Sequence, residues 1–447
     1  MLLRFVVSNF LSFDKETEFN MLAGSFKTHK HHVYNAGKVD VLKAAAIYGA
    51  NGAGKSNLII AIEFLRDAVK DGAIEESVNT NKFKLNKANK DKPVSFEIEF
   101  SIEKKIYSYG VSFDNQSVVE EWLYESGITT EDKLIFERKQ TKSKKPSIQV
   151  SEKLKKTVKQ KLLIELMEEN LLKSNELFIG KTDTFKAKEI INARNWIVEN
   201  LIIVYPGSKF QYLVQMISQS SGFNDFANEL LNTFDTGATE LGIETTDFNK
   251  FFGEDGESIK NEYHSELENG ESILWETSLG NVLISKEKNK YIVKKLVAIH
   301  KSVDNEPVSF DLFQESDGTQ RLLDFIPAIV SILHNDSTYI IDEIDQSLHP
   351  ALIRALIQKI MNDDTTQGQI VFSTHESNLI DLEIFRQDEI WFAEKDKAAG
   401  STQLYSLSDY KPRYDLDIRK GYLQGRFGAI PFLDDLKNLN WQIKENA

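Results

Sequence analysis

The chain has 447 residues, of which 41% are hydrophobic and none is cysteine, and its formal net charge is −14. That length exceeds one ordinary domain, so we expect two or three lobes that share or flank a core. The acidic balance excludes a protein that coats nucleic acid or an anionic membrane with its whole surface. The missing cysteines exclude disulfides, cysteine zinc sites and thiol catalysis. Because no stretch reads as a signal peptide or membrane span, we expect a soluble, cytoplasmic protein.

The chain opens with a predicted strand and a tight connection. Residues 2–8 alternate apolar and polar and continue into Asn9–Phe13. A group of three histidines follows at His29, His31 and His32. Clustered exposed histidines with no acidic residue close by are typical of a plain loop, and a metal site is the alternative.

The segment Gly49–Ser56 reads G-A-N-G-A-G-K-S and joins an apolar run at 44–48 to an amphipathic helix. This context predicts a P-loop, whose glycines let the backbone turn its N–H groups toward a phosphate. Lys55 is expected to reach the β- and γ-phosphates of ATP, and Ser56 to bind Mg²⁺. The candidate nucleotide-binding residues here are Gly49, Asn51, Gly52, Gly54, Lys55, Ser56 and Asn57.

Three alternating segments after the P-loop helix predict an antiparallel meander. They cover 94–102, 106–113 and, more loosely, 118–124. An antiparallel meander does not continue a parallel sheet, so we expect it to form a side lobe beside the nucleotide.

A basic stretch interrupts this acidic protein between Arg138 and Lys161, where Glu152 is the single acid. It runs into a predicted helical region at 151–175. The functional interpretation is contact with DNA phosphates, and the structural alternative is a solvated loop and helix face.

A second set of candidate residues lies in the last third of the chain. Thr338–Ile341 is an apolar strand that ends in Asp342 and Glu343, the pattern of a Walker B segment. Asp342 is expected to order Mg²⁺ or its water, and Glu343 to orient and deprotonate the attacking water. The apolar run 370–373 leads to His375, which is placed to contact the γ-phosphate.

A third group of candidate residues precedes the Walker B strand. Ser316 and Gly318 start a predicted helix and suit γ-phosphate binding through backbone N–H groups and a hydroxyl. The alternative is an ordinary helix N-cap formed by Ser316 or Asp317. The segment Ser347–Pro350 follows Glu343 at the distance of a dimer-contacting loop.

The ordered set of these motifs resembles the soluble ABC-type AAA family ATPases. Within them it is similar to the branch that holds the repair and chromosome-maintenance ATPases and the overcoming-lysogeny-defect and RloA-like defence ATPases. Asn9–Phe13 resembles the opening of that branch, and Tyr422–Pro431 resembles an RloA-like ending. The resemblance covers roughly 1–125 and 305–432.

The resemblance implies a fold class and a division of the chain. The fold expected is an α/β P-loop NTPase with an ABC-type ATPase head, an antiparallel β side lobe and a mixed, largely helical insertion. The two halves of the head are expected at 1–125 and 305–447, and an inserted arm domain at 126–304.

The resemblance also implies partners. In this family two heads pair head to tail, so Ser316 and Gly318 of one copy are expected to complete the ATP site of a homodimer or higher oligomer. The expected activity is ATP hydrolysis with ATP and Mg²⁺ as cofactors, in a sensor that controls a separate effector, a nuclease, in defence against phage or foreign DNA. The alternatives are a DNA-repair or chromosome-maintenance ATPase and, from another class, the ATP-binding subunit of a transporter.

Overcoming-lysogeny-defect proteins carry their own nuclease after the ATPase. Asp415 and Asp417 match its Asp-x-Asp pair, and Glu389 or Glu394 lies upstream. Only a short segment follows His375, which is less than a typical domain, so we interpret these acids as structural.

Overall fold

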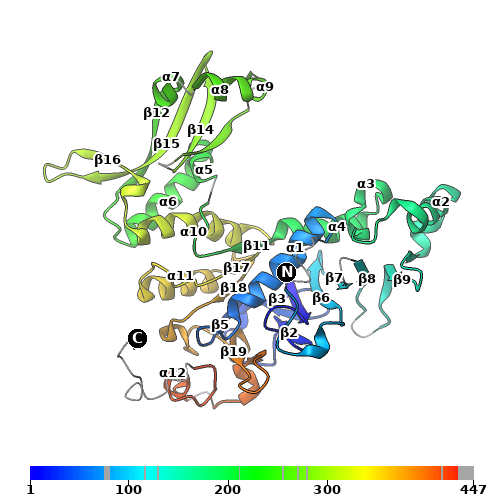
Figure 1. Cartoon of the computed structure of the whole chain (residues 1–447). Helices are drawn as coiled ribbons and strands as arrows, with labels where there is room; N and C mark the ends of the chain where they lie inside the picture. The colour runs from blue at the N-terminus through cyan, green and yellow to red at the C-terminus, as the bar shows by residue number, and fades with distance from the viewer. Residues whose placement is uncertain are drawn as a thin grey trace, which may run out of the picture. The chain divides into compact units, whose positions relative to one another are not determined.

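The structure is a computed structural model of the whole chain, shown in Figure 1. It describes residues 1–74, 81–114, 117–127, 130–210, 212–253, 256–268, 271–277, 280–413 and 416–430. The chain divides into two compact units. The first unit comprises Met1–Pro206, Ile332–Ile344 and Ile357–Ala447, and the second comprises Gly207–Ser331 and Asp345–Leu356.

The first unit contains a six-stranded sheet with the strand order β11-β17-β18-β5-β19-β20. Its strands are β5 (Ala44–Tyr48), β11 (Leu201–Val204), β17 (Thr338–Ile341), β18 (Gln369–Ser373), β19 (Ile390–Lys395) and β20 (Thr402–Ser406). Neighbours from β11 to β19 pair in parallel, and β20 is antiparallel to β19. Strands β5, β17 and β18 are buried along their whole length, as apolar runs in the middle of a parallel sheet are. The predicted strands of the P-loop and Walker B segments are therefore confirmed.

Helix α1 (Lys55–Asp71) follows β5 after the glycine loop. Its buried residues Leu58, Ile62, Leu65 and Val69 recur every three or four positions, so one face of the helix packs on the core. The helix ends at Gly72, whose φ of 65° is the left-handed conformation that glycine adopts without strain.

A seven-stranded antiparallel sheet forms the rest of the core of this unit, in the order β10-β9-β8-β7-β6-β1-β2. Its strands are β1 (Leu2–Ser8), β2 (Thr17–Asn20), β6 (Val94–Ile102), β7 (Lys105–Asp114), β8 (Ser117–Glu125), β9 (Lys133–Gln140) and β10 (Pro146–Val150). A short hairpin, β3 (Val33–Asn35) with β4 (Asp40–Leu42), stands outside both sheets. The predicted antiparallel side lobe is confirmed, and β9 and β10 extend it beyond residue 125.

Short helices complete the first unit: α2 (Val158–Leu166), α3 (Thr182–Phe185), α4 (Lys188–Asn195) and α12 (Ile418–Leu423). Single π-helical turns follow α2 and α4 at Met167–Leu171 and Trp196–Asn200. In the second of these turns Trp196 stacks on Phe100 of β6 with ring centroids 4.3 Å apart, which ties this helical segment to the antiparallel sheet.

The second unit is built on a five-stranded antiparallel sheet with β16 at one side of β15. Its strands are β12 (Glu240–Asp247), β13 (Ile273–Thr277), β14 (Gly280–Glu287), β15 (Lys290–Lys301) and β16 (Pro307–Asp311). Its helices are α5 (Leu213–Gln219), α6 (Ser221–Thr233), α7 (Phe248–Phe252), α8 (Gly256–Glu262) and α9 (His264–Glu268). Phe248, Leu267, Val282 and Val293 lie in a small core of their own. The predicted mixture of strands and helices in the middle of the chain is confirmed.

Two longer helices, α10 (Asp317–His334) and α11 (Pro350–Asn362), have residues in both units. The bounds of these two units differ from the predicted segments 1–125, 126–304 and 305–447. Those three segments stay a prediction about how the chain is organised. Among the described residues, none of the helices combines the length and the apolar character that crossing a bilayer requires.

Candidate functional site

Three neighbouring strands of the parallel sheet end side by side at its carboxyl edge. Ser373 at the end of β18 pairs with Ile47 of β5 on one side, and Phe372 pairs with Ile341 of β17 on the other. The residues that follow these strands are the glycine loop after β5, His375 after β18, and Asp342 with Glu343 after β17. The sheet therefore gathers the three sequence motifs of this unit at the edge where α/β proteins bind ligands.

The glycine loop is closely surrounded by the rest of the unit. Gly54 has a φ of 108°, and a Cβ atom on it would lie 2.1 Å from the Thr402 hydroxyl oxygen. A Cβ atom on Gly49 would lie 2.4 Å from the carbonyl oxygen of Ala393. Gly52 also has a positive φ, of 76°, but has no neighbour within 4 Å. The loop conformation thus requires glycine for its backbone at 52, for space at 49, and for both at 54.

Lys55 begins α1 and is buried beneath the loop. Its Nζ donates to the carbonyl oxygen of Gly49 at 2.9 Å and lies 3.2 Å from Nε2 of His375. Because an ammonium group can only donate, Nε2 of His375 accepts at that distance. The structure thus brings together the predicted phosphate-binding lysine and the predicted γ-phosphate sensor, which are 320 positions apart in the chain.

Ser373 organises the two acids that follow β17. Its hydroxyl donates to Oδ1 of Asp342, and it accepts the backbone N–H of Glu343 at 2.8 Å. Glu343 has a φ of 50°, a conformation that is costly for a residue with a side chain and is held here by that hydrogen bond. Sequence reasoning assigned no role to Ser373, because a serine at a strand end has no local signal for a partner on another strand.

Tyr205 follows β11 and donates its hydroxyl to Oε2 of Glu63 on α1. Burial raises the pKa of the Tyr205 hydroxyl, and the nearby carboxylates of Glu63 and Asp342 raise it further. The phenol therefore stays protonated at neutral pH and acts as a donor that links β11 to α1.

Sequence reasoning also missed a group of hydrogen-bonded side chains that contacts the glycine loop. The Ser12 hydroxyl accepts from Nδ2 of Asn57 at 2.8 Å and from the Thr402 hydroxyl at 2.7 Å. Thr402 also lies 2.8 Å from the carbonyl oxygen of Ala53 in the loop. Asn57, predicted to bind nucleotide, is thus engaged with Ser12. The resemblance of Asn9–Phe13 to a family opening was the only signal for Ser12, and Thr402 had none.

The remaining predicted residues of the loop are more open. Asn51 is exposed and Ser56 is half-buried in the first turn of α1, beside Lys55. A hydroxyl and a carboxylate, as offered by Ser56 and Asp342, are oxygen donors of the kind that Mg²⁺ prefers.

Ser316 and Gly318 belong to the second unit, where they start α10. The Ser316 hydroxyl accepts the backbone N–H of Thr319 at 3.1 Å, which is the bond an N-cap makes. A Cβ atom on Gly318 would lie 2.9 Å from the carbonyl oxygen of Ser347, so this helix start and the predicted dimer-contacting loop are neighbours. Ser316 is exposed.

The acids compared with a nuclease have other partners. Asp415 lies outside the described residues. Asp417 caps α12 by accepting the backbone N–H of Lys420 at 2.8 Å, and Glu394 accepts from the Tyr405 hydroxyl at 2.9 Å. Glu389 is fully buried and binds His32 at 3.0 Å. These contacts agree with the structural interpretation of the acids.

Arg138 corrects one detail of the predicted basic stretch. It is buried in β9 with Glu121, because strand alternation turns Phe136 and Arg138 inward and Glu137 and Lys139 outward. The lysines beyond it are exposed, namely Lys142, Lys144, Lys145, Lys153, Lys156, Lys159 and Lys161.

A parallel sheet whose carboxyl edge gathers a glycine loop with its lysine, two consecutive acids and a histidine defines an α/β P-loop NTPase. Residues 44–381, which include all these groups, match the family described as "AAA domain, putative AbiEii toxin, Type IV TA system". The match covers well over half of the chain, so the chain belongs to this family of AAA ATPase domains.

The solved structures to which the chain is similar include Smc head domains. The SMC head domain from Thermotoga maritima is 12% identical, with 91% of this chain and 98% of that chain covered and a TM-score of 0.39. An Smc head with an extended coiled coil bound to the C-terminal domain of ScpA, derived from Pyrococcus furiosus, is 12% identical, with 95% and 99% covered and a TM-score of 0.41. No curated protein matches the chain.

Proposed function

We propose that the chain is an ATP-hydrolysing, dimeric sensor that controls a separate effector, a nuclease, in defence against phage or foreign DNA. The observation that carries the ATPase part is the meeting of Lys55 and His375, 3.2 Å apart, beside the acids that Ser373 holds. A lysine, a histidine and two carboxyls at one edge of a parallel sheet suit recognition and hydrolysis of a nucleoside triphosphate.

Each residue has a part in this proposal. Lys55 and the loop N–H groups bind the β- and γ-phosphates of ATP, and His375 contacts the γ-phosphate. Ser56 and Asp342 hold Mg²⁺, whose charge assists phosphoryl transfer when it is bound. Glu343 orients the attacking water and takes up its proton.

The dimeric part rests on the second unit. Ser316 is exposed at the start of α10, where backbone N–H groups have no helical partner and attract anions. We place Ser316 and Gly318 of one copy over the ATP held by another. The bond to Thr319 is also explained if Ser316 is an ordinary N-cap of its own helix. An experiment on mixed dimers separates this interpretation from contact with the ATP of a second copy.

The defence part is supported by the family description, which refers to a toxin of a toxin–antitoxin system. Asp417, Glu389 and Glu394 make structural contacts within the chain, which supports the proposal that the nuclease is not built from these acids. In this proposal the regulated chemistry belongs to a partner protein.

Glu343→Gln tests the ATPase proposal. The amide cannot take up a proton, so phosphate release from ATP should fall by about 10²-fold or more while ATP affinity is kept. Lys55→Ala should lose nucleotide binding itself. Both are measured by phosphate release and by calorimetric titration of ATP with purified protein. Glu165→Gln, an exposed acid on α2, is the matched control and should behave as wild type. Unchanged hydrolysis by Glu343→Gln would remove Glu343 as the base.

A cell-based assay tests the defence part. Cells that carry the chain with its neighbouring genes should resist phage infection, and Lys55→Ala should abolish that resistance. The neighbouring product should co-purify with the chain. If resistance is absent and the protein instead binds DNA in a salt-dependent way through Lys142, Lys144 and Lys145, the DNA-maintenance alternative replaces this proposal.

A further inference from the structure

The three histidines of the first unit come together in space. His31 and His32 lie in a short 3₁₀ turn before β3, His29 is its N-cap, and one ligating atom from each lies within 4.8 Å of the others. The His31 and His32 rings are 4.4 Å apart at their centroids, and the His29 and His32 rings are 4.8 Å apart. The sequence alone favoured a plain loop here, because it showed no acidic partner.

Each of these rings has one nitrogen fixed by an acceptor from a distant segment. His29 Nε2 donates to the carbonyl oxygen of Leu382 at 2.8 Å, and His31 Nε2 meets Oδ1 of Asn362 at 3.0 Å. An oxygen acceptor places the ring proton on the nitrogen it contacts, so Nδ1 of both rings keeps its lone pair. Outer partners of this kind orient the histidine ligands of metal ions.

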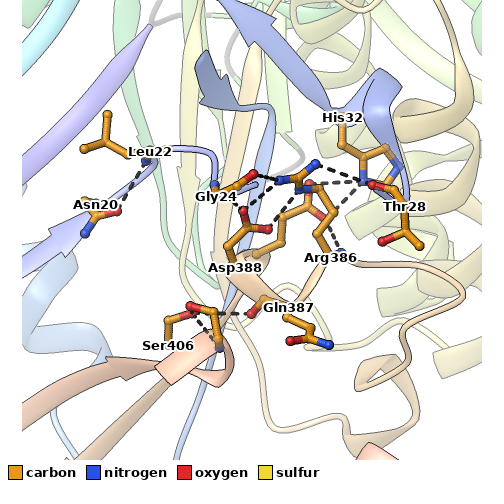
Figure 2. Close-up of polar contacts among 11 residues, drawn as sticks. Asn20, Leu22, Gly24, Thr28, His32, Arg386, Gln387, Asp388 and Ser406 are labelled. Carbon is orange, nitrogen blue, oxygen red and sulfur yellow. Dashed lines mark hydrogen bonds and ion pairs between the residues drawn. The ribbon is translucent and has the colours of Figure 1, made fainter. Parts of the chain in front are cut away.

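His32 has the strongest outer partner. Its Nδ1 lies 3.0 Å from both carboxylate oxygens of Glu389, and both side chains are buried. Figure 2 shows His32 at one end of a network that continues through Arg386 and Asp388 to Gly24. The carboxylate fixes the proton on Nδ1 and leaves Nε2 of His32 as the free ligand atom, the arrangement of a carboxylate–histidine–metal triad.

The guanidinium of Arg386 belongs to the same network. It is bound by Asp388 at 2.9 and 2.8 Å, so its charge is compensated within the network.

We propose that His29, His31 and His32 form a binding site for a divalent transition metal ion of the zinc type, separate from the nucleotide site. Zinc–nitrogen bonds of about 2.0–2.1 Å bring ligand nitrogens to roughly 3.5 Å of one another. The three ligating atoms here lie within 4.8 Å of one another. His31 is exposed, which gives the ion access and leaves a fourth position to water. The ion would join the turn before β3 to the segments around Asn362, Leu382 and Glu389.

Zinc titration of the purified full-length chain tests this site, with any affinity tag removed and without nucleotide. Competition with a chromophoric chelator should give one zinc ion per chain, and bound Co²⁺ should show the intense visible absorption of four-coordinate cobalt. His29→Asn and His31→Asn should each weaken binding by about tenfold or more, and zinc should raise the Tm of wild type by more than it raises the Tm of either variant. These two positions are used because His32 is buried, and its replacement can unfold the chain.

His334→Asn is the matched control, since His334 is exposed at the end of α10 and should bind zinc as wild type does. Asp342→Asn should also keep the ion. Loss of zinc in Asp342→Asn would place the metal at the nucleotide site and overturn the proposal. So would equal zinc affinity in His29→Asn, His31→Asn and wild type, or no stoichiometric binding of zinc, cobalt or nickel.

Discussion

Gly54 shows how tightly single residues are constrained in the glycine loop. Its φ of 108° is strained for any other residue, and a Cβ atom would also meet the Ser12 hydroxyl at 2.9 Å and the Thr402 hydroxyl at 2.1 Å. Both hydroxyls belong to a hydrogen-bonded group that also holds Asn57 and Ala53. A side chain at position 54 must therefore break that group as well as strain the backbone.

The left-handed conformation alone costs an alanine about 1–2 kcal/mol. We expect Gly54→Ala to lower the free energy of unfolding by more than that amount. Gly52→Ala is the matched control, because Gly52 has the same sign of φ and nothing within 4 Å, so only the backbone cost applies. Urea unfolding of both variants measures the difference. Equal losses would mean that the Ser12 and Thr402 hydroxyls do not resist a side chain at position 54.

The residues that could be predicted are those inside contiguous motifs. Lys55 and His375 were predicted from strand-and-loop patterns, and the structure brings them together. Ser373 sits within such a pattern, but its role depends on Asp342 of the next strand. The bond between Ser12 and Thr402 spans 390 positions, and nothing local to either residue indicates it.

At the scale of elements, the antiparallel sheet is tied to the segment before α3 by buried charges. Glu121 of β8 is fully buried and accepts the backbone N–H groups of Phe178 at 2.7 Å and Ile179 at 2.9 Å. Arg138 of β9 lies 3.8 Å from Glu121 and donates to the carbonyl oxygens of Lys173 and Glu176. Burial raises the pKa of Glu121, and Arg138 and the two N–H groups oppose that shift.

Replacing one member of this pair leaves the other buried without compensation. We expect Glu121→Leu to lower the free energy of unfolding by about 3–5 kcal/mol, and the double variant Glu121→Leu with Arg138→Met to lose less than the sum of the two single variants. Denaturant unfolding of the three variants measures this coupling. Lys139→Met, on the exposed face of the same strand, should change little. Additive losses would show that the two side chains act independently.

Arg138 also shows why the middle of the chain was harder to predict. A run of basic residues looks like one surface, but a strand sends alternate residues to opposite faces. Where periodicity was strict, as in β6, the predicted element is confirmed. Short helices and π-helical turns, such as Met167–Leu171, depend on packing that the sequence does not display.

At the scale of the whole molecule, the proposed composite site makes a prediction about mixtures of variants. Lys55→Ala damages the phosphate site of its own copy. Ser316→Arg removes the cap of its own α10 and, in this proposal, the group that its copy offers to the partner. Each variant alone should be inactive as a dimer. An equimolar mixture should regain part of the hydrolysis, because mixed dimers keep one site with a normal lysine and a normal serine.

Phosphate release from the two variants, alone and mixed, measures this recovery. The control is a mixture of Lys55→Ala with the double variant that carries both Lys55→Ala and Ser316→Arg. It should stay inactive, because every nucleotide site in it lacks Lys55. If the mixture of single variants is no more active than its components, Ser316 acts as the N-cap of its own helix and not on a second copy.

The bond between Ser12 and Thr402 has a consequence for the order in which the protein is made. During synthesis, β5 and α1 leave the ribosome early, whereas the strands on both sides of β5 belong to residues after 368. The partners of Lys55 and Ser12 follow 320 and 390 positions later. A nascent chain therefore carries the glycine loop for most of its translation without a finished pocket, and nucleotide can stabilise the fold only once the last strands are in place.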